Sequence, residues 1–155
     1  MNLYEEFFSV VRAFGSGGVR YCVVGGMALA FHDQPRFTRD MDFLVLPDQL
    51  EGAATVLHAL GYFESAPPWT FPNSVLTLHR FVKMEEADFL VVDVLSGADK
   101  RHRDIVEQSL EEKWAKGTVR LARRDDLVWM KQQRGSDQDL VDIGNLTRDK
   151  DRENR

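Results

Sequence analysis

Apolar spacing and helix-start signals along the chain predict three helices. Residues 2–14 have this spacing after a candidate cap at Asn2, and they end at a glycine-rich stretch. Residues 48–60 repeat the pattern and end at Gly61. A third helix is predicted to begin near Arg124, because two acids follow where the first turn of a helix favours negative charge.

Shorter apolar or alternating runs predict the strands of one sheet. These strands span residues 19–24, 40–46, 75–82 and 88–95, with a short edge strand at 117–122. The runs at 75–82 and 88–95 are expected to form a β-hairpin. The proline-rich residues 62–73 predict an irregular loop, and the charged residues 96–114 predict a further helix. The expected class is α/β (α+β), with a mixed sheet of about five strands flanked by helices.

Length and composition predict one domain. The chain has 155 residues, of which 43% are hydrophobic, which is enough for one core and too few for two ordinary domains. Residues 1–147 are assigned to this domain. Residues 148–155 are charged, lack apolar anchors and are expected to be a disordered tail. The single cysteine, Cys22, is interpreted as a small buried side chain.

Charge and hydropathy bound the partners. The net charge of −5 provides no overall basic field that would recruit nucleic acid, although it does not exclude a local contact. No apolar run is long enough to span a membrane. A cytoplasmic protein without a membrane partner is therefore expected.

Two glycines directly follow the first predicted strand. Gly25 and Gly26 let the backbone turn sharply and approach a ligand without an intervening Cβ. The helix predicted over residues 25–33 would point free N–H groups and the positive end of its dipole towards this turn. The arrangement favours an anion such as a phosphate.

Acidic residues mark the next predicted strands. Asp40 and Asp42 leave the same face of one strand, and like charges this close are normally stable only with a cation between them. Carboxylate oxygens suit Mg²⁺ or Mn²⁺. Asp93 lies in an almost continuous apolar strand, where a carboxylate is costly unless it is paired or bound to metal. Asp88 is its rival, but it stands at the strand edge and is readily interpreted as solvated.

The diglycine turn followed by two alternating acids resembles the signature of the nucleotidyltransferase superfamily, which has the polymerase-β-like fold. The fuller pattern, with His32 after the turn and with Arg36 and Thr38 before the acids, is similar to the AbiEii-type toxin branch in a minimal single-domain form. In this superfamily a third acid follows on a later strand, and Asp93 fits that position.

The C-terminal part resembles a further motif of these proteins, in which a lysine precedes Gly-Arg-x-Lys-Asp and another acid. The matching residues are Lys131, Gly135, Asp139 and Asp142. The usual Arg and Lys are replaced here by Ser136 and Gln138, and the loss of the Arg removes a fork that could hold a phosphate.

The resemblance implies transfer of a nucleoside monophosphate from an NTP to a hydroxyl acceptor, with Mg²⁺ or Mn²⁺ as cofactor. The implied catalytic and metal-binding residues are Asp40, Asp42 and Asp93. The implied nucleotide- and phosphate-binding residues are Gly25, Gly26, Arg36, Thr38, Lys131 and Asp139. The acceptor stays open between tRNA, a protein and a small molecule such as an aminoglycoside. The AbiEii branch further implies a toxin–antitoxin or phage-defence role, with an antitoxin or a helical protein as partner.

Each part of this pattern also has a purely structural interpretation. The diglycine then forms an ordinary turn between a strand and a helix, the paired acids are surface residues of an edge strand, and Lys131 is solvated. The alternative function is therefore a non-catalytic module that uses the same fold to bind a nucleotide or a partner protein. A third hypothesis is a structural subunit completed by a separate helical protein.

Overall fold

The computed structural model describes residues 1–32, 39–114, 117–134 and 141–147. The helices are α1 (Leu3–Ser16), α2 (Gly25–Phe31), η1 (Pro47–Gln49), α3 (Leu50–Ala59), α4 (Lys100–Glu107) and α5 (Arg124–Arg134), and residues 141–147 are also helical. The strands are β1 (Cys22–Val24), β2 (Asp40–Val45), β3 (Phe63–Glu64), β4 (Trp69–Thr70), β5 (Thr77–Glu85), β6 (Asp88–Ser96), β7 (Leu110–Trp114) and β8 (Gly117–Leu121). None of the helices in the described ranges combines the length and apolar character needed to cross a bilayer.

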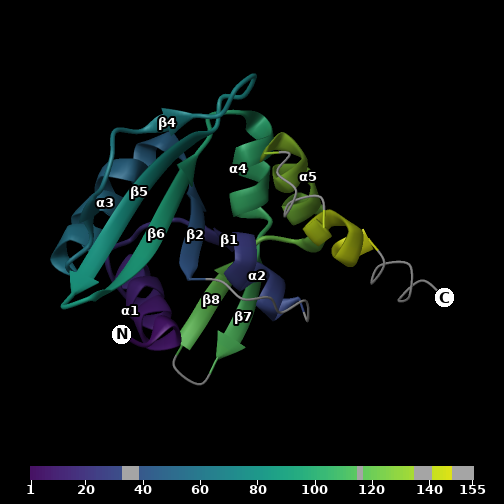
Figure 1. The fold of residues 1–155 in the computed structure, drawn as a ribbon. Helices are drawn as coiled ribbons and strands as arrows, with labels where there is room; N and C mark the ends of the chain where they lie inside the picture. The colour runs from purple at the N-terminus through teal and green to yellow at the C-terminus, as the bar shows by residue number, and fades with distance from the viewer. Residues whose placement is uncertain (33–38, 115–116, 135–140, 148–155) are drawn as a thin grey trace.

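The strands form one mixed sheet with β2 near its centre (Figure 1). Their order is β3-β5-β6-β2-β1-β8-β7, and β4 pairs with β5 outside this path. β2 runs antiparallel to β1 and parallel to β6. β5 and β6 form the predicted hairpin, paired antiparallel from Thr77↔Ser96 to Glu85↔Asp88. The predicted α/β class with a mixed sheet is therefore confirmed.

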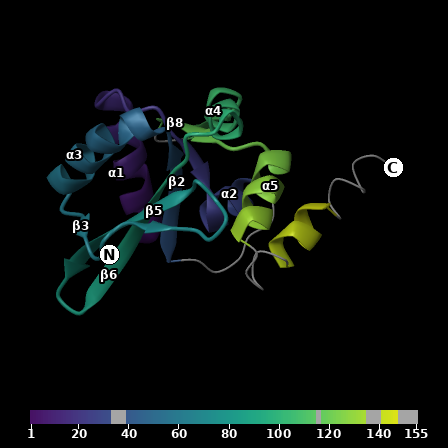
Figure 2. The same ribbon diagram turned by 90° about the horizontal axis from the view of Figure 1, so that it is seen from above.

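One face of the sheet is covered by α1 and α3. Phe43 of β2 stacks on Phe7 and meets Phe14 edge-on, with ring centroids 6.0 and 5.1 Å apart. As the sequence predicts, Asn2 caps α1, because its side-chain oxygen accepts a hydrogen bond from the backbone N–H of Glu5 at 3.1 Å. Figure 2 shows α1 and α3 on one side of β2 and α5 on the other.

The opposite face of the sheet is covered in part. Leu127 and Met130 of α5 line a small pocket together with residues of β1 and β6. On the β3-β5-β6 side of the sheet, Phe63, Met84 and Phe89 remain 59%, 74% and 47% exposed. The α5 side of this face is therefore packed, while the hairpin side is open to solvent.

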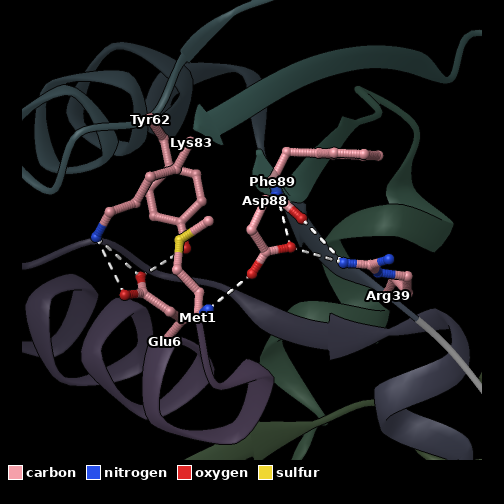
Figure 3. Close-up of polar contacts among 7 residues, drawn as sticks. All are labelled: Met1, Glu6, Arg39, Tyr62, Lys83, Asp88 and Phe89. Carbon is pink, nitrogen blue, oxygen red and sulfur yellow. Dashed lines mark hydrogen bonds and ion pairs between the residues drawn. The ribbon is translucent and has the colours of Figure 1, made fainter. Parts of the chain in front are cut away.

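A polar network fastens α1 to the sheet, as Figure 3 shows. The carboxylate of Glu6 accepts hydrogen bonds from Tyr62 Oη at 2.8 Å and from Lys83 Nζ at 3.1 Å. Burial and the neighbouring Glu6 carboxylate raise the pKa of Tyr62, so the phenol stays protonated and keeps donating.

The structure corrects several expectations at the edges of the sheet. Within the described residues the sheet has eight strands instead of about five, because β3 and β4 form within the predicted loop at 62–73 and β7 forms within the predicted helix at 96–114. The side chains of β7 from Glu111 to Trp114 are exposed, so this edge strand has no buried side to produce an apolar alternation. β8 lies between β1 and β7 and is not the edge strand that was predicted. Of the predicted strand at 19–24, Cys22–Val24 forms β1.

Candidate functional site

The turn between β1 and α2 lies directly against a carboxylate. Gly25 has a φ of +68°, a left-handed conformation that suits glycine. A Cβ built at Gly25 would overlap Oδ2 of Asp42 and lie 2.7 Å from its Cγ. This proximity follows from the pairing of β1 with β2, in which Val24 is the register partner of Asp42. Both the backbone conformation and the missing side chain are therefore needed here.

Pairing of β2 with β6 brings two of the predicted acids side by side. Asp42 and Asp93 are register partners in these parallel strands, so their side chains leave the same face of the sheet. Both are buried, at 9% and 5% exposure, and Asp40 is half-buried one position further along that face. Asp40, Asp42 and Asp93 therefore share one sheet face, next to the glycine turn.

Arg80 joins this group of acids and was not singled out from the sequence. It stands directly opposite Asp93 in the β5–β6 hairpin. Its Nε donates to Asp93 Oδ1 at 2.8 Å and one terminal nitrogen donates to Oδ2 at 2.9 Å. The hydrogen bond to Asp93 raises the pKa of Arg80, and the charges of Asp40 and Asp42 raise it further. The guanidinium is therefore bound to Asp93 and lies close enough to Asp40 and Asp42 to interact with their charges.

The turn of the hairpin fixes this pair, but its two central residues, Glu86 and Ala87, are not the Asn-Gly or Asp-Gly that marks such a turn in a sequence. Glu85 and Asp88 are register partners, so the turn between them is tight and fixes every later pair of the hairpin. Glu86 in this turn has a φ of 55°, a conformation that a residue other than glycine rarely adopts. Counting outward from this turn would have placed Arg80 opposite Asp93.

Asp88, the rival candidate for the third acid, belongs to a different cluster. Its carboxylate accepts hydrogen bonds from the Met1 ammonium at 2.7 Å and from Arg39 at 2.9 Å (Figure 3). These two positive partners lower the pKa of Asp88. Asp88 therefore holds the beginning of the chain and the start of β2 together.

Lys131 of α5 lies beside the glycine turn but is already paired. It lines the small pocket that also includes Val24 and Gly25. Its Nζ donates to Asp142 Oδ2 at 3.0 Å, and the two side chains are 3% and 2% exposed. The predicted solvated lysine is therefore wrong, because this lysine is buried and ties the helical residues 141–147 to α5. Its role towards phosphate stays a prediction.

The remaining predicted residues are partly beyond the described structure. Gly26 is buried in the first turn of α2. Arg36, Thr38 and Asp139 lie outside the described residues, as do the motif positions 135, 136 and 138.

The oxygen ligands suit a hard divalent cation, but the three acids do not form a ready cage. Within the described ranges, no group of three or more His, Cys, Asp or Glu side chains has an arrangement that could hold a metal ion. Both oxygens of Asp93 are bound to Arg80. Asp40 and Asp42 would supply carboxylate oxygens to such a cation, and Asp93, which would be the third acid, is held by Arg80.

Comparison with known proteins identifies the fold. No protein-family model and no curated protein matches the chain. A solved structure described as a "putative nucleotidyltransferase (TM1012)" from Thermotoga maritima is 10% identical and superposes with a TM-score of 0.60, over 97% of this chain and 92% of that one. The chain has the nucleotidyltransferase fold.

Two further solved structures are similar to the chain. JHP933 from Helicobacter pylori is 17% identical with a TM-score of 0.57, and the match covers 95% of this chain but 65% of JHP933. The antibiotic-resistance factor ANT(2'')-Ia is 14% identical with a TM-score of 0.54, over 84% of this chain and 71% of that one. The fold that the sequence resemblance implies is therefore confirmed, and the superfamily and its AbiEii branch stay predictions.

Proposed function

We propose that this chain is a metal-dependent nucleotidyltransferase that moves a nucleoside monophosphate from an NTP to a hydroxyl acceptor. The observation that carries the proposal is the position of Asp42, whose carboxylate lies against Gly25 and beside Asp93. A phosphate chain at the glycine turn would then meet a cation held by the acids.

In the proposed reaction, the acceptor oxygen forms a bond to the α-phosphorus of the NTP. The bond from that phosphorus to the leaving pyrophosphate breaks, and the proton of the hydroxyl passes to solvent. Gly25 and Gly26 would let the phosphates approach the backbone, while Asp40 and Asp42 would hold a Mg²⁺ or Mn²⁺ ion. Such an ion supplies Lewis acidity and offsets the charge of the triphosphate.

The roles of the other predicted residues are proposed from the resemblance. Lys131 would balance negative charge behind the glycine turn, since it lies beside Gly25 in the packed pocket. Arg36 and Thr38 would fix the segment before β2, with phosphate contact as a second role, and Asp139 would serve the nucleotide site. Asp93 would join the ion that activates the acceptor.

The test is incorporation of label from each α-labelled NTP, with Mg²⁺ or Mn²⁺, into the RNA, protein and small-molecule fractions of a cell extract. We expect label in one fraction with the wild type and background with Asp42→Asn, which removes a ligand charge but keeps the shape of the side chain. Asp48→Asn is the matched control, because Asp48 is an exposed acid of η1. Equal incorporation by Asp42→Asn and wild type would refute the assignment.

The same experiment identifies the acceptor class, which we propose to be a tRNA, a protein or a small molecule. The toxin–antitoxin or phage-defence role is proposed from the AbiEii resemblance alone. A partner protein would be revealed by the size of the chain in solution with and without the product of a neighbouring gene.

A non-catalytic binding module is the second candidate. It is favoured by the two closed pairs at the site, Arg80 with Asp93 and Lys131 with Asp142. Nucleotide binding without release of pyrophosphate, from protein shown to be folded, would support this module and count against the transferase.

A further inference from the structure

The Arg80–Asp93 pair joins a mobile partner to a fixed one. The side chain of Asp93 is 7% exposed and lies in the middle of β6, whereas that of Arg80 is 47% exposed. A buried carboxylate needs a positive or hydrogen-bonding partner, and the bidentate guanidinium fork provides both. The long arginine stem can move into solvent, while the short Asp93 side chain cannot.

The position of Arg80 distinguishes it from an ordinary surface ion pair. Asp40, Asp42 and Asp93 all leave one face of the sheet, and Arg80 leaves the same face because it is the cross-strand neighbour of Asp93. The charges of Asp40 and Asp42 also act on its guanidinium. Arg80 therefore lies on the sheet face that carries the three clustered acids.

A guanidinium in this position competes with a metal ion in two ways. It donates one hydrogen bond to each oxygen of Asp93, at 2.8 and 2.9 Å, and so uses one of the two lone pairs that each oxygen could offer a divalent ion. Its charge also repels a divalent ion at the neighbouring carboxylates.

We propose that Arg80 is an internal cation that competes with a divalent metal ion for Asp93. In the resting protein Arg80 then holds Asp93, and a metal ion gains Asp93 as a ligand when Arg80 leaves it. This inference rests on the proposed function, because it requires that the acids bind a metal ion.

The experiment is a titration with Mn²⁺ alone, in which unbound Mn²⁺ is measured by electron paramagnetic resonance. Arg80→Gln should lower the Kd for Mn²⁺ by roughly tenfold or more, because a positive charge next to the site is removed. Adding Asp93→Asn to Arg80→Gln should abolish this gain. Arg101→Gln is the matched control, since Arg101 is also 47% exposed and donates to the largely buried Asp126 at 2.9 Å.

A second variant covers the case in which Arg80→Gln does not fold. Arg80→Lys keeps the charge but loses the fork, so one oxygen of Asp93 is freed and a smaller gain in Mn²⁺ affinity is expected. Saturating Mn²⁺ should also raise the Tm of each folded Arg80 variant more than that of the wild type.

The outcomes separate the two proposals. If wild-type Mn²⁺ binding does not weaken in Asp42→Asn, the metal site fails and the proposed function fails with it. If binding depends on Asp42 but neither Arg80 variant gains affinity over Arg101→Gln, the competition by Arg80 is refuted while the proposed function stands.

Discussion

Replacing Gly25 with alanine tests the close contact on which the candidate site depends. Two effects of this substitution should lower the free energy of unfolding. A residue with a Cβ in the left-handed conformation costs about 1–2 kcal/mol, and Gly25 has a φ of +68°. The new Cβ would also overlap the Asp42 carboxylate, and relieving such overpacking typically costs about 1–3 kcal/mol.

The chain contains a control that separates these two costs. Gly18 has a φ of +70°, but a Cβ built there would meet no atom within 4 Å. Gly18→Ala should therefore lower the free energy of unfolding by the backbone strain alone, about 1–2 kcal/mol. Gly25→Ala adds the overlap with Asp42 and should lower it by about 2–5 kcal/mol. For a chain of this size, each kcal/mol lost from the free energy of unfolding corresponds to a fall in Tm of about 2–4 °C.

Urea denaturation of the wild type and both variants measures these differences directly. Mn²⁺ affinity gives a second measurement, because Gly25→Ala should displace the Asp42 carboxylate and Gly18→Ala should not. Equal stability of the two variants would show that Asp42 moves aside without cost, and the argument that glycine is required for close approach would be refuted.

Two further predictions concern buried polar groups away from the acids. Lys131→Met should destabilise the fold by about 3–5 kcal/mol, because it removes the cation that pairs with the buried Asp142 carboxylate. Adding Asp142→Leu should recover most of the loss, and wild-type stability of the single variant in urea would contradict this prediction. Burial lowers the pKa of His102 below its usual 6.5, so the unfolded chain takes up the proton first as the pH falls. The stability that His102 contributes is therefore present above about pH 6.5 and is lost as the pH falls through its folded-state pKa, with a slope of at most about 1.4 kcal/mol per pH unit. Urea denaturation between about pH 8 and pH 5 should show a shallower loss for His102→Leu than for the wild type, and identical pH dependence would refute the role of His102.

The central elements of the fold could be predicted because local sequence determines them. The alternation of acids with Met41 and Phe43 predicts the strand that forms β2, although the structure buries both faces of this strand from Met41 to Val45. The edges could not be predicted in this way, because β7 is exposed and polar and its pairing with β8 depends on residues elsewhere in the chain.

The sequence predicted which residues form the candidate site but not which of them contact one another. Periodicity placed Asp40 and Asp42 on one face, and resemblance singled out Asp93. The register that makes Asp42 and Asp93 neighbours joins strands far apart in the sequence, and no local pattern contains it. The burial of Lys131 against Asp142 was missed for a similar reason, because the partner belongs to a different helical segment.

The hairpin that carries Asp93 also carries Arg80, and this affects how the protein can fold. A chain that has emerged from the ribosome only as far as β2 contains Gly25, Asp40 and Asp42, but it has no β6 against which to align them. When the β5–β6 hairpin forms, its short turn already places Arg80 opposite Asp93. Asp93 would then enter the centre of the sheet already paired with Arg80. β6 could therefore pack against β2 without the cost of desolvating an unpaired carboxylate.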